Sequence, residues 1–378
     1  MERRRFLRTG LALGAAGSGL ATLPSCVRRP APAAAAVGPR RGTNGPIRLN
    51  SNENPLGLSP AARQAVLQDL GEANRYPRQA RTDLTQAIAA RHGVGTDHVQ
   101  LGAGSGEILQ MTVQATPPDA VVVTAHPTFE EVGGYARVAG RRLVTVPLRA
   151  DWAHDVARMR AAAGTGPALV FICNPNNPTG TLTPCSEVEA WIAEADPRVT
   201  FLVDEAYVEF PEDAAYRSAV PLIARHPNLV VSRTFSKIHA MAGLRLGYAL
   251  AQPATIARLR LLACGNNANG LALAAARASL GDTAHQERTL AANRAARRLL
   301  TDTLDALGLE HLPSHTNFVM HRIPGELAQY NARMREAGFL VGRAFPPLLS
   351  MSRVSLGTPD EMELFAAALR DFRRRDWV

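Results

Sequence analysis

The stretch Thr234-Phe235-Ser236-Lys237-Ile238-His239-Ala240-Met241-Ala242-Gly243-Leu244-Arg245 contains the only lysine of this 378-residue chain. Lysine and arginine together account for 42 residues, so arginine serves as the cation almost everywhere else. A guanidinium, whose pKa lies above ~12, never becomes a free amine, whereas a lysine amine can attack a carbonyl and form an imine. Survival of one lysine by chance in an arginine-rich composition is the alternative. The lone Lys237 therefore indicates a position that needs amine chemistry.

Short continuous apolar runs upstream of Lys237 predict the strands of one sheet. They lie at residues 121–123, 143–146, 169–172, 201–203 and 229–231. Val99-Gln100-Leu101 adds a short strand that runs into a glycine loop and the first turn of a helix. Helical stretches separate most of them, at 129–139, 151–163 and 184–195. Strands that are apolar on both faces and joined by helical crossovers indicate an α/β fold with a mostly parallel sheet. Ligands of such sheets bind at the carboxyl ends of the strands.

The rest of the chain predicts a second, smaller α/β domain. Helices are expected at 60–70, from 77 onward, through 254–306, at 326–337 and at 359–373, with short strands at 318–320 and 354–356. We assign residues 73–265 to the large domain, and residues 46–72 and 266–378 to the small domain.

Residues 1–45 predict a signal peptide and linker. Arg3-Arg4-Arg5-Phe6-Leu7-Arg8 precedes a weakly apolar run over 11–23, a pattern that resembles a twin-arginine signal for export of folded proteins to the periplasm. Lipidation of Cys26 and cleavage after residues 34–36 both remain open, and a basic flexible tail is the alternative. No later stretch reaches the ~20 apolar residues of a membrane span.

Charge and cysteine content exclude several function classes. The net charge is +9, but the first 45 residues hold eight arginines and a single acidic residue, so the remainder is nearly neutral. This distribution does not indicate a nucleic-acid partner. The cysteines at 26, 173, 185 and 264 show no CxxC pair and no histidine at metal-binding spacing, so neither a metal site nor a disulfide framework is expected.

Polar residues after the predicted strands suit pyridoxal phosphate (PLP), if Lys237 holds its aldehyde as an imine. The cofactor accepts electrons only while its ring nitrogen is protonated, and Asp204, at a strand end, is the candidate carboxylate. Tyr207 and Asn177 can donate to the ring oxygen. Each residue type also has a structural explanation, because asparagine suits turns and aspartate can cap a helix.

The phosphate, the ring face and the substrate each need a further partner. Backbone and side-chain donors and one cation can hold the phosphate: Gly104, Ser105, Ser236 and Arg245. The Gly104 loop alone is weak evidence, because tight turns need glycine anyway. Phe129 can stack on the ring, and the guanidinium of Arg353 can hold a substrate carboxylate.

These motifs resemble those of fold-type I, class I/II PLP-dependent aminotransferases, and are most similar to histidinol-phosphate aminotransferases. The resemblance covers residues 49–371 and rests on Asn52-Glu53-Asn54-Pro55, Arg75-Tyr76-Pro77 and the motifs at 102–105, 174–180, 204–207, 236–248 and 353–358. It implies a large domain with a sheet of seven strands, and it makes Lys237 the Schiff-base lysine and proton shuttle. It also implies that Tyr76 reaches the cofactor phosphate of a neighbouring subunit, in a homodimer with shared active sites.

The resemblance predicts a ping-pong aminotransferase that moves an amino group between an amino acid, or an amino-alcohol phosphate, and a 2-oxo acid. Leu56 stands where histidinol-phosphate enzymes usually carry an aromatic residue that helps to bind the substrate phosphate. The second basic residue, Arg343, is kept, so a donor with an acidic distal group remains possible, and Arg343 and Asn177 join Arg353 as expected substrate-binding residues. The predicted export also differs from those cytoplasmic enzymes. Decarboxylation or oxidation on the same fold remains an alternative, as does a PLP-loaded protein that only binds amino compounds.

Overall fold

The computed structural model describes residues 45–378. The predicted export signal, its linker and Cys26 lie outside these residues. Among the helices of residues 45–378, none is both long and apolar enough to cross a membrane.

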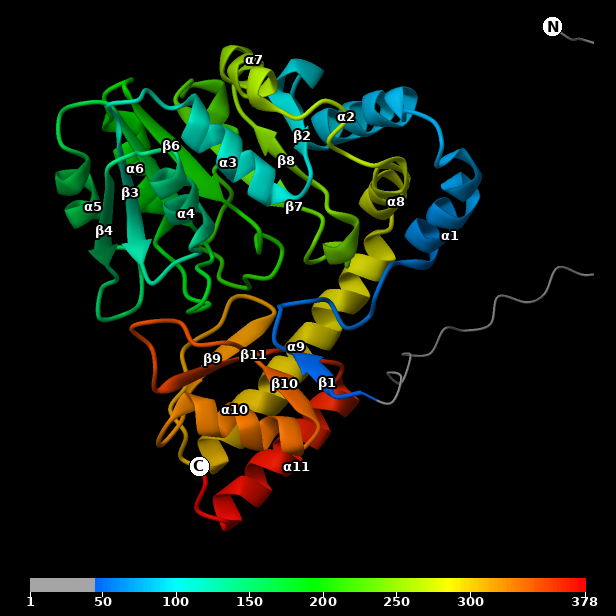
Figure 1. Cartoon of the computed structure of the whole chain (residues 1–378), viewed down its shortest axis with the longest axis vertical. Helices are drawn as coiled ribbons and strands as arrows, with labels where there is room; N and C mark the ends of the chain where they lie inside the picture. Colours follow the sequence, from blue (N-terminus) through cyan, green and yellow to red (C-terminus); the bar gives the residue numbers. More distant parts are fainter. Residues whose placement is uncertain (1–44) are drawn as a thin grey trace, which may run out of the picture. The chain divides into compact units, whose positions relative to one another are not determined.

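A sheet of seven strands forms the centre of the larger part of the molecule (Figure 1), in the order β2-β8-β7-β6-β5-β3-β4. Its strands are β2 (Val99–Gly102), β3 (Val121–His126), β4 (Leu143–Pro147), β5 (Ala168–Cys173), β6 (Val199–Asp204), β7 (Leu229–Thr234) and β8 (Gly247–Leu250). Only β8 runs against its neighbours, since it pairs antiparallel with both β7 and β2. The predicted mostly parallel α/β sheet is confirmed, but β8 was missed because four residues that begin with glycine give little strand signal.

Both faces of this sheet are buried, which explains the continuous apolar runs. On β5, Leu169 and Phe171 pack into one core and Val170 and Ile172 into another, because successive strand residues point to opposite faces. The first core is completed by α3 (Ser105–Ala115), α4 (Glu131–Val138) and α7 (Pro253–Leu262). The second is completed by α2 (Arg78–His92), α5 (Val156–Ala163), α6 (Cys185–Glu194) and α8 (Gly270–Leu280). Each fully buried side chain of this size stabilises the fold by roughly 1.5–3 kcal/mol.

Two predicted helical stretches differ from the structure. The helix expected at 151–163 begins only at Val156, where the Asp155 carboxylate accepts a hydrogen bond from the Arg158 backbone N–H and caps it. The stretch expected at 254–306 is three helices, α7, α8 and α9 (Thr283–Ala306). Asn269 caps α8 and Asp282 caps α9, so each new helix starts at a residue whose side chain satisfies its free backbone N–H groups.

A separate, smaller core lies under two short sheets. β1 (Ile47–Leu49) pairs parallel with β10 (Phe339–Val341), and β9 (Phe318–Arg322) pairs antiparallel with β11 (Met351–Ser355). Apolar residues of α9, α10 (Leu327–Glu336) and α11 (Pro359–Arg374) fill this core. β1 and β10, which have three residues each, were not predicted.

The helix α1 (Pro60–Asp69) packs on α8, and Ala62 of α1 belongs to the core of the large sheet. Both helices lie outside the residues 73–265 that we assigned to the large domain, and the exact domain boundaries stay a prediction. Four short 3-10 turns complete the fold: η1 (Leu70–Glu72), η2 (Thr96–His98), η3 (Val220–Ala224) and η4 (Ala242–Leu244).

Candidate active site

A cavity of about 350 Å³ opens at the carboxyl ends of β5, β6 and β7. The structure brings most of the predicted site residues to its wall: Ser105, Phe129, Asn177, Asp204, Tyr207, Ser236, Lys237, Arg245, Arg343 and Arg353. Most of them follow strands of the large sheet, which collects them because its parallel strands end on the same side. Arg343 and Arg353 come instead from the two short sheets, beyond β10 and on β11.

Lys237 follows β7 and is partly buried in this wall. Its amine donates a hydrogen bond to the Asn52 carbonyl oxygen at 3.2 Å and lies 5.6 Å from the centre of the Tyr207 ring. Burial and the positive charge of Arg353 lower the pKa of Lys237 to about 8, although Asp204 acts in the opposite direction. About one-tenth of this amine is therefore neutral, and nucleophilic, at pH 7, far more than for an ordinary lysine.

Asp204 ends β6 and is 2% exposed. Its Oδ1 is buried and has no hydrogen-bond partner among residues 45–378. Burial, followed by the negative charge of Glu131, raises the pKa of Asp204 to about 7. A buried acceptor in this condition is satisfied by a ligand that brings a cationic N–H group.

Tyr207 and Asn177 are each held by a second side chain. The Tyr207 hydroxyl accepts a hydrogen bond from Asn52 Nδ2 at 2.9 Å, which leaves the phenolic O–H free to donate into the cavity. Burial raises the pKa of Tyr207, so the phenol stays protonated. Asn52 belongs to a motif that the sequence analysis quoted without giving this side chain a role. Its contact with Tyr207 spans 155 positions, so nothing in the local sequence pointed to it.

An anion site lies at the start of α3. Gly104 precedes this helix with a φ of +82°, and a Cβ built there would lie 2.5 Å from Nη2 of Arg245. Glycine therefore lets the guanidinium approach the helix N-terminus, where free backbone N–H groups favour negative charge. Ser105 and Ser236 line the same end of the cavity.

Arg353, on β11, is 7% exposed. Its guanidinium donates to Asn177 Oδ1 at 2.6 Å and to the Asn50 carbonyl oxygen at 3.0 Å, and it stacks on Phe345 at 4.5 Å from the ring centre. Burial lowers the pKa of Arg353 to about 10, which still leaves it cationic at neutral pH. This buried cation has neutral partners only, so it can receive a carboxylate.

Two residues singled out in the sequence lie elsewhere. Tyr76, which precedes α2, is 75% exposed and does not line this cavity. Leu56 lines a separate, smaller hollow with Phe210 and Thr289. Glu130 and Phe345, which the sequence analysis missed, line the cavity instead.

The residues present fit PLP. The lone amine of Lys237 suits an aldehyde, the unpaired Oδ1 of Asp204 suits a protonated ring nitrogen, and the Gly104–Arg245 site suits a phosphate. Phe129 lies in the cavity wall as the predicted stacking residue. Among residues 45–378, no cluster of three or more His, Cys, Asp or Glu side chains could hold a metal ion, and Cys173, Cys185 and Cys264 are free thiols.

Comparisons with known proteins agree with this geometry. Residues 44–369 match the family "Aminotransferase class I and II". The chain is 39% identical to histidinol-phosphate aminotransferase 1 of Cupriavidus pinatubonensis, over 86% of this chain and 88% of that protein. It is 38% identical to an aromatic amino acid aminotransferase of Rhodococcus opacus, over 87% and 91% of the two chains.

A solved structure of histidinol-phosphate aminotransferase from Sinorhizobium meliloti, in complex with pyridoxal-5'-phosphate, superposes with a TM-score of 0.80. It is 30% identical and covers 87% of this chain and 91% of that one. The chain thus belongs to the class I and II aminotransferases, as a PLP-dependent enzyme that is similar to histidinol-phosphate aminotransferases.

Proposed function

We propose that this enzyme moves an amino group from an amino donor to a 2-oxo acid acceptor by a ping-pong mechanism, with Lys237 as its proton carrier. The observation that carries the proposal is the lysine amine, with a pKa of about 8, in one cavity with a buried arginine whose partners are neutral. The amine can exchange protons and the arginine can hold a carboxylate.

Bound PLP supplies an electron sink for the negative charge left when the donor loses its α-proton. Lys237 takes that proton and later returns it, because a base with a pKa near the working pH both accepts and releases protons readily. Arg353 would orient the donor through its α-carboxylate, and Tyr207 and Asn177 would donate to the cofactor's ring oxygen. Asp204 would stabilise positive charge at the ring nitrogen. Ser105, Ser236, Arg245 and the Gly104 loop would hold the phosphate.

We propose further that two copies of the chain share their active sites through Tyr76. The exposure of this tyrosine supports the idea, as do the exposed Leu67 and Leu70 nearby in the chain. Mixing a Tyr76→Ala chain with a Lys237→Ala chain tests it, because only hybrid dimers would hold one site with both residues intact. Activity that fails to reappear on mixing would contradict a shared site.

Export to the periplasm is also a proposal, supported by the Arg-Arg-x-Phe-Leu pattern of residues 3–7. Export in the folded state would allow PLP to be bound in the cytoplasm first. Replacing Arg3 and Arg4 by lysines should keep the protein in the cytoplasmic fraction of its host. Unchanged fractionation would exclude the twin-arginine route.

The main experiment follows the visible absorption of PLP in the purified enzyme while amino acids are added without oxygen. Transamination predicts that a donor removes this band and that a 2-oxo acid restores it. Carbon dioxide as the product would indicate a decarboxylase, and peroxide, once oxygen is admitted, an oxidase.

The single lysine gives this experiment a matched control. Lys237→Arg keeps the positive charge but removes the amine. Borohydride reduction should attach PLP covalently to the peptide that contains residue 237 in the wild type, and to no peptide in the variant. Attachment in both proteins would contradict the role of Lys237.

A further inference from the structure

The mouth of the cavity holds an ion pair that joins two distant segments. Arg343, two residues beyond β10, donates from Nη2 to Glu130 Oε2 at 2.7 Å. Glu130 directly precedes α4, and the two side chains are 58% and 53% exposed. The Arg343 guanidinium also lies 4.3 Å from the centre of the Phe345 ring.

Arg353 stacks on the same Phe345 ring, but its hydrogen-bond partners carry no charge. Its guanidinium is 4.5 Å from the centre of Phe345, and its hydrogen-bond partners are the neutral oxygens of Asn177 and Asn50. Among residues 45–378, Arg353 has no carboxylate partner, whereas Arg343 has Glu130. Of the two cations on Phe345, only the inner one lacks a counter-charge.

We infer that Glu130 is a specificity-determining residue, which neutralises Arg343 and makes the cavity select donors whose distal end carries no negative charge. This inference rests on the proposed function, because it concerns the amino donor. Arg353 receives the α-carboxylate, and the distal group then meets Phe345 and a neutral ion pair. Aromatic and aliphatic amino acids fit this arrangement.

A donor with a distal carboxylate or phosphate has to compete with Glu130 for Arg343. If it succeeds, two negative groups share one cation at the cavity mouth, and such like-charge contacts are used in proteins to reject wrong partners. Because the pair is half-exposed and screened by salt, the penalty is moderate. We expect a change of about two- to fivefold when the carboxylate is removed, in line with the small energies of exposed pairs.

The test is the Glu130→Gln enzyme loaded with PLP, assayed with glutamate and with phenylalanine as donors. The ratio of kcat/KM for glutamate to that for phenylalanine should rise about two- to fivefold, and more at low ionic strength. Glu194→Gln is the matched control, since Glu194 pairs with Arg160 at 2.9 Å at similar exposure and does not line the cavity. The control should leave the ratio unchanged.

Binding of unreactive analogues provides a readout that is independent of turnover. Calorimetric titration of the PLP-loaded protein with glutarate and with 3-phenylpropionate should show the same shift in the ratio of dissociation constants. In an Arg343→Ala background, Glu130→Gln should have no further effect on either ratio, because the pair acts as a unit.

The outcomes separate this inference from the proposed function. An unchanged ratio in both assays overturns the role of Glu130, as does an equal rise in the Glu194→Gln control. If no donor is turned over but the glutarate ratio shifts as expected, the proposed function fails while the assignment of Glu130 stands. If donors are turned over but neither ratio changes, the proposed function stands and the assignment of Glu130 fails.

Discussion

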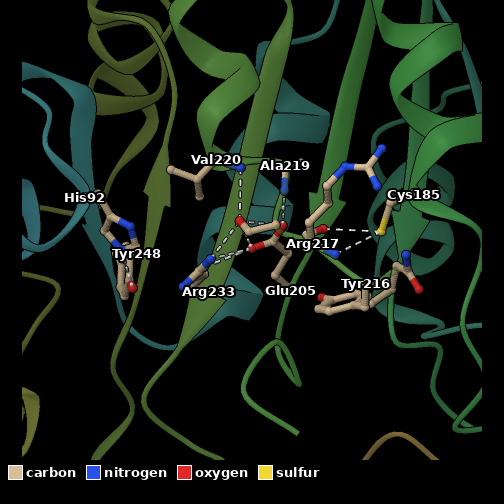
Figure 2. A network of polar contacts seen from close by, with 11 residues as sticks. His92, Cys185, Glu205, Tyr216, Arg217, Ala219, Val220, Arg233 and Tyr248 are labelled. Atoms are coloured by element: carbon tan, nitrogen blue, oxygen red, sulfur yellow. Dashed lines mark hydrogen bonds and ion pairs between the residues drawn. The ribbon is translucent and has the colours of Figure 1, made fainter. Parts of the chain in front are cut away.

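Asp204 and Glu205 are neighbours at the end of β6 and are both 2% exposed, yet their surroundings differ completely. The Glu205 carboxylate accepts from four donors: Nε and Nη2 of Arg233, the Ala219 backbone N–H and the Ser218 hydroxyl, which lies within hydrogen-bond distance of both carboxylate oxygens. Figure 2 shows this network, in which Arg233 of β7 lies 2.7 Å from Glu205. Asp204 lines the cavity, and its buried Oδ1 has no hydrogen-bond partner among the described residues.

The difference separates an acid that holds the fold together from one that is reserved for a ligand. A buried carboxylate is costly unless it is paired and hydrogen-bonded. Glu205 is paired and hydrogen-bonded within the chain, so it links the carboxyl ends of β6 and β7. Asp204 is not, so the free energy that its burial costs is recovered only when a cationic group enters the cavity.

Replacing Asp204 by asparagine should produce the largest effect. An amide of nearly the same shape carries no charge and cannot stabilise a protonated ring nitrogen, so kcat/KM for the best donor should fall by about 10³-fold. The thermal stability of the cofactor-free variant should not decrease, because the substitution removes a buried carboxylate whose Oδ1 lacks a hydrogen-bond partner. Activity within tenfold of wild type would show that Asp204 does not act on the cofactor.

Breaking the ion pair between Glu205 and Arg233 should lower the stability of the fold rather than the activity. Arg233→Met leaves Glu205 buried and uncompensated, which should lower the free energy of unfolding by about 3 kcal/mol. Urea unfolding measures this loss, while activity per PLP-loaded molecule should stay near that of wild type. Arg160→Met, which breaks an exposed pair with Glu194, is the control and should cost less than ~1 kcal/mol. If Arg233→Met and Arg160→Met lower the free energy of unfolding equally, burial of Glu205 does not explain the loss.

The pH dependence of the cofactor-free protein tests the Asp204 side of the comparison without a ligand. The pKa of Asp204 is raised to about 7 in the folded state, so the folded protein holds this proton more tightly than the unfolded chain. The stabilisation is therefore complete below pH ~4 and is lost as pH rises through about 7, which should lower the free energy of unfolding by about 4 kcal/mol, because the pKa shift of about three units is worth ~1.4 kcal/mol per unit. Burial also raises the pKa of Glu209 to about 7. Denaturant titrations between pH 4 and 8 should therefore show a clearly smaller decline in Asp204→Asn than in wild type. Equal slopes in the two proteins would contradict the raised pKa.

Much of the fold was predictable because its strands are buried on both faces. Five of the seven strands in the large sheet appear in the sequence as continuous apolar runs, and β2 was predicted as a short strand before a glycine loop. Only β8, four residues that begin with glycine, was missed. The breaks between α7, α8 and α9 were missed because short polar linkers interrupt an otherwise helical composition. The partners of single side chains were not predictable at all. Arg343 and Glu130 are 213 positions apart, and local periodicity carries no information over that distance.

The sequence by itself determined the chemistry available to this protein: one amine at Lys237, an acid at a strand end and an arginine for a carboxylate. Residue type alone dictates which side chain can form an imine, accept from a cation or bind an anion. Only the tertiary structure decided which of two adjacent acids is satisfied and which of two arginines on Phe345 is free for a substrate. Those outcomes depend on long-range pairing and burial, which arise when the chain folds and the strand ends meet at one edge.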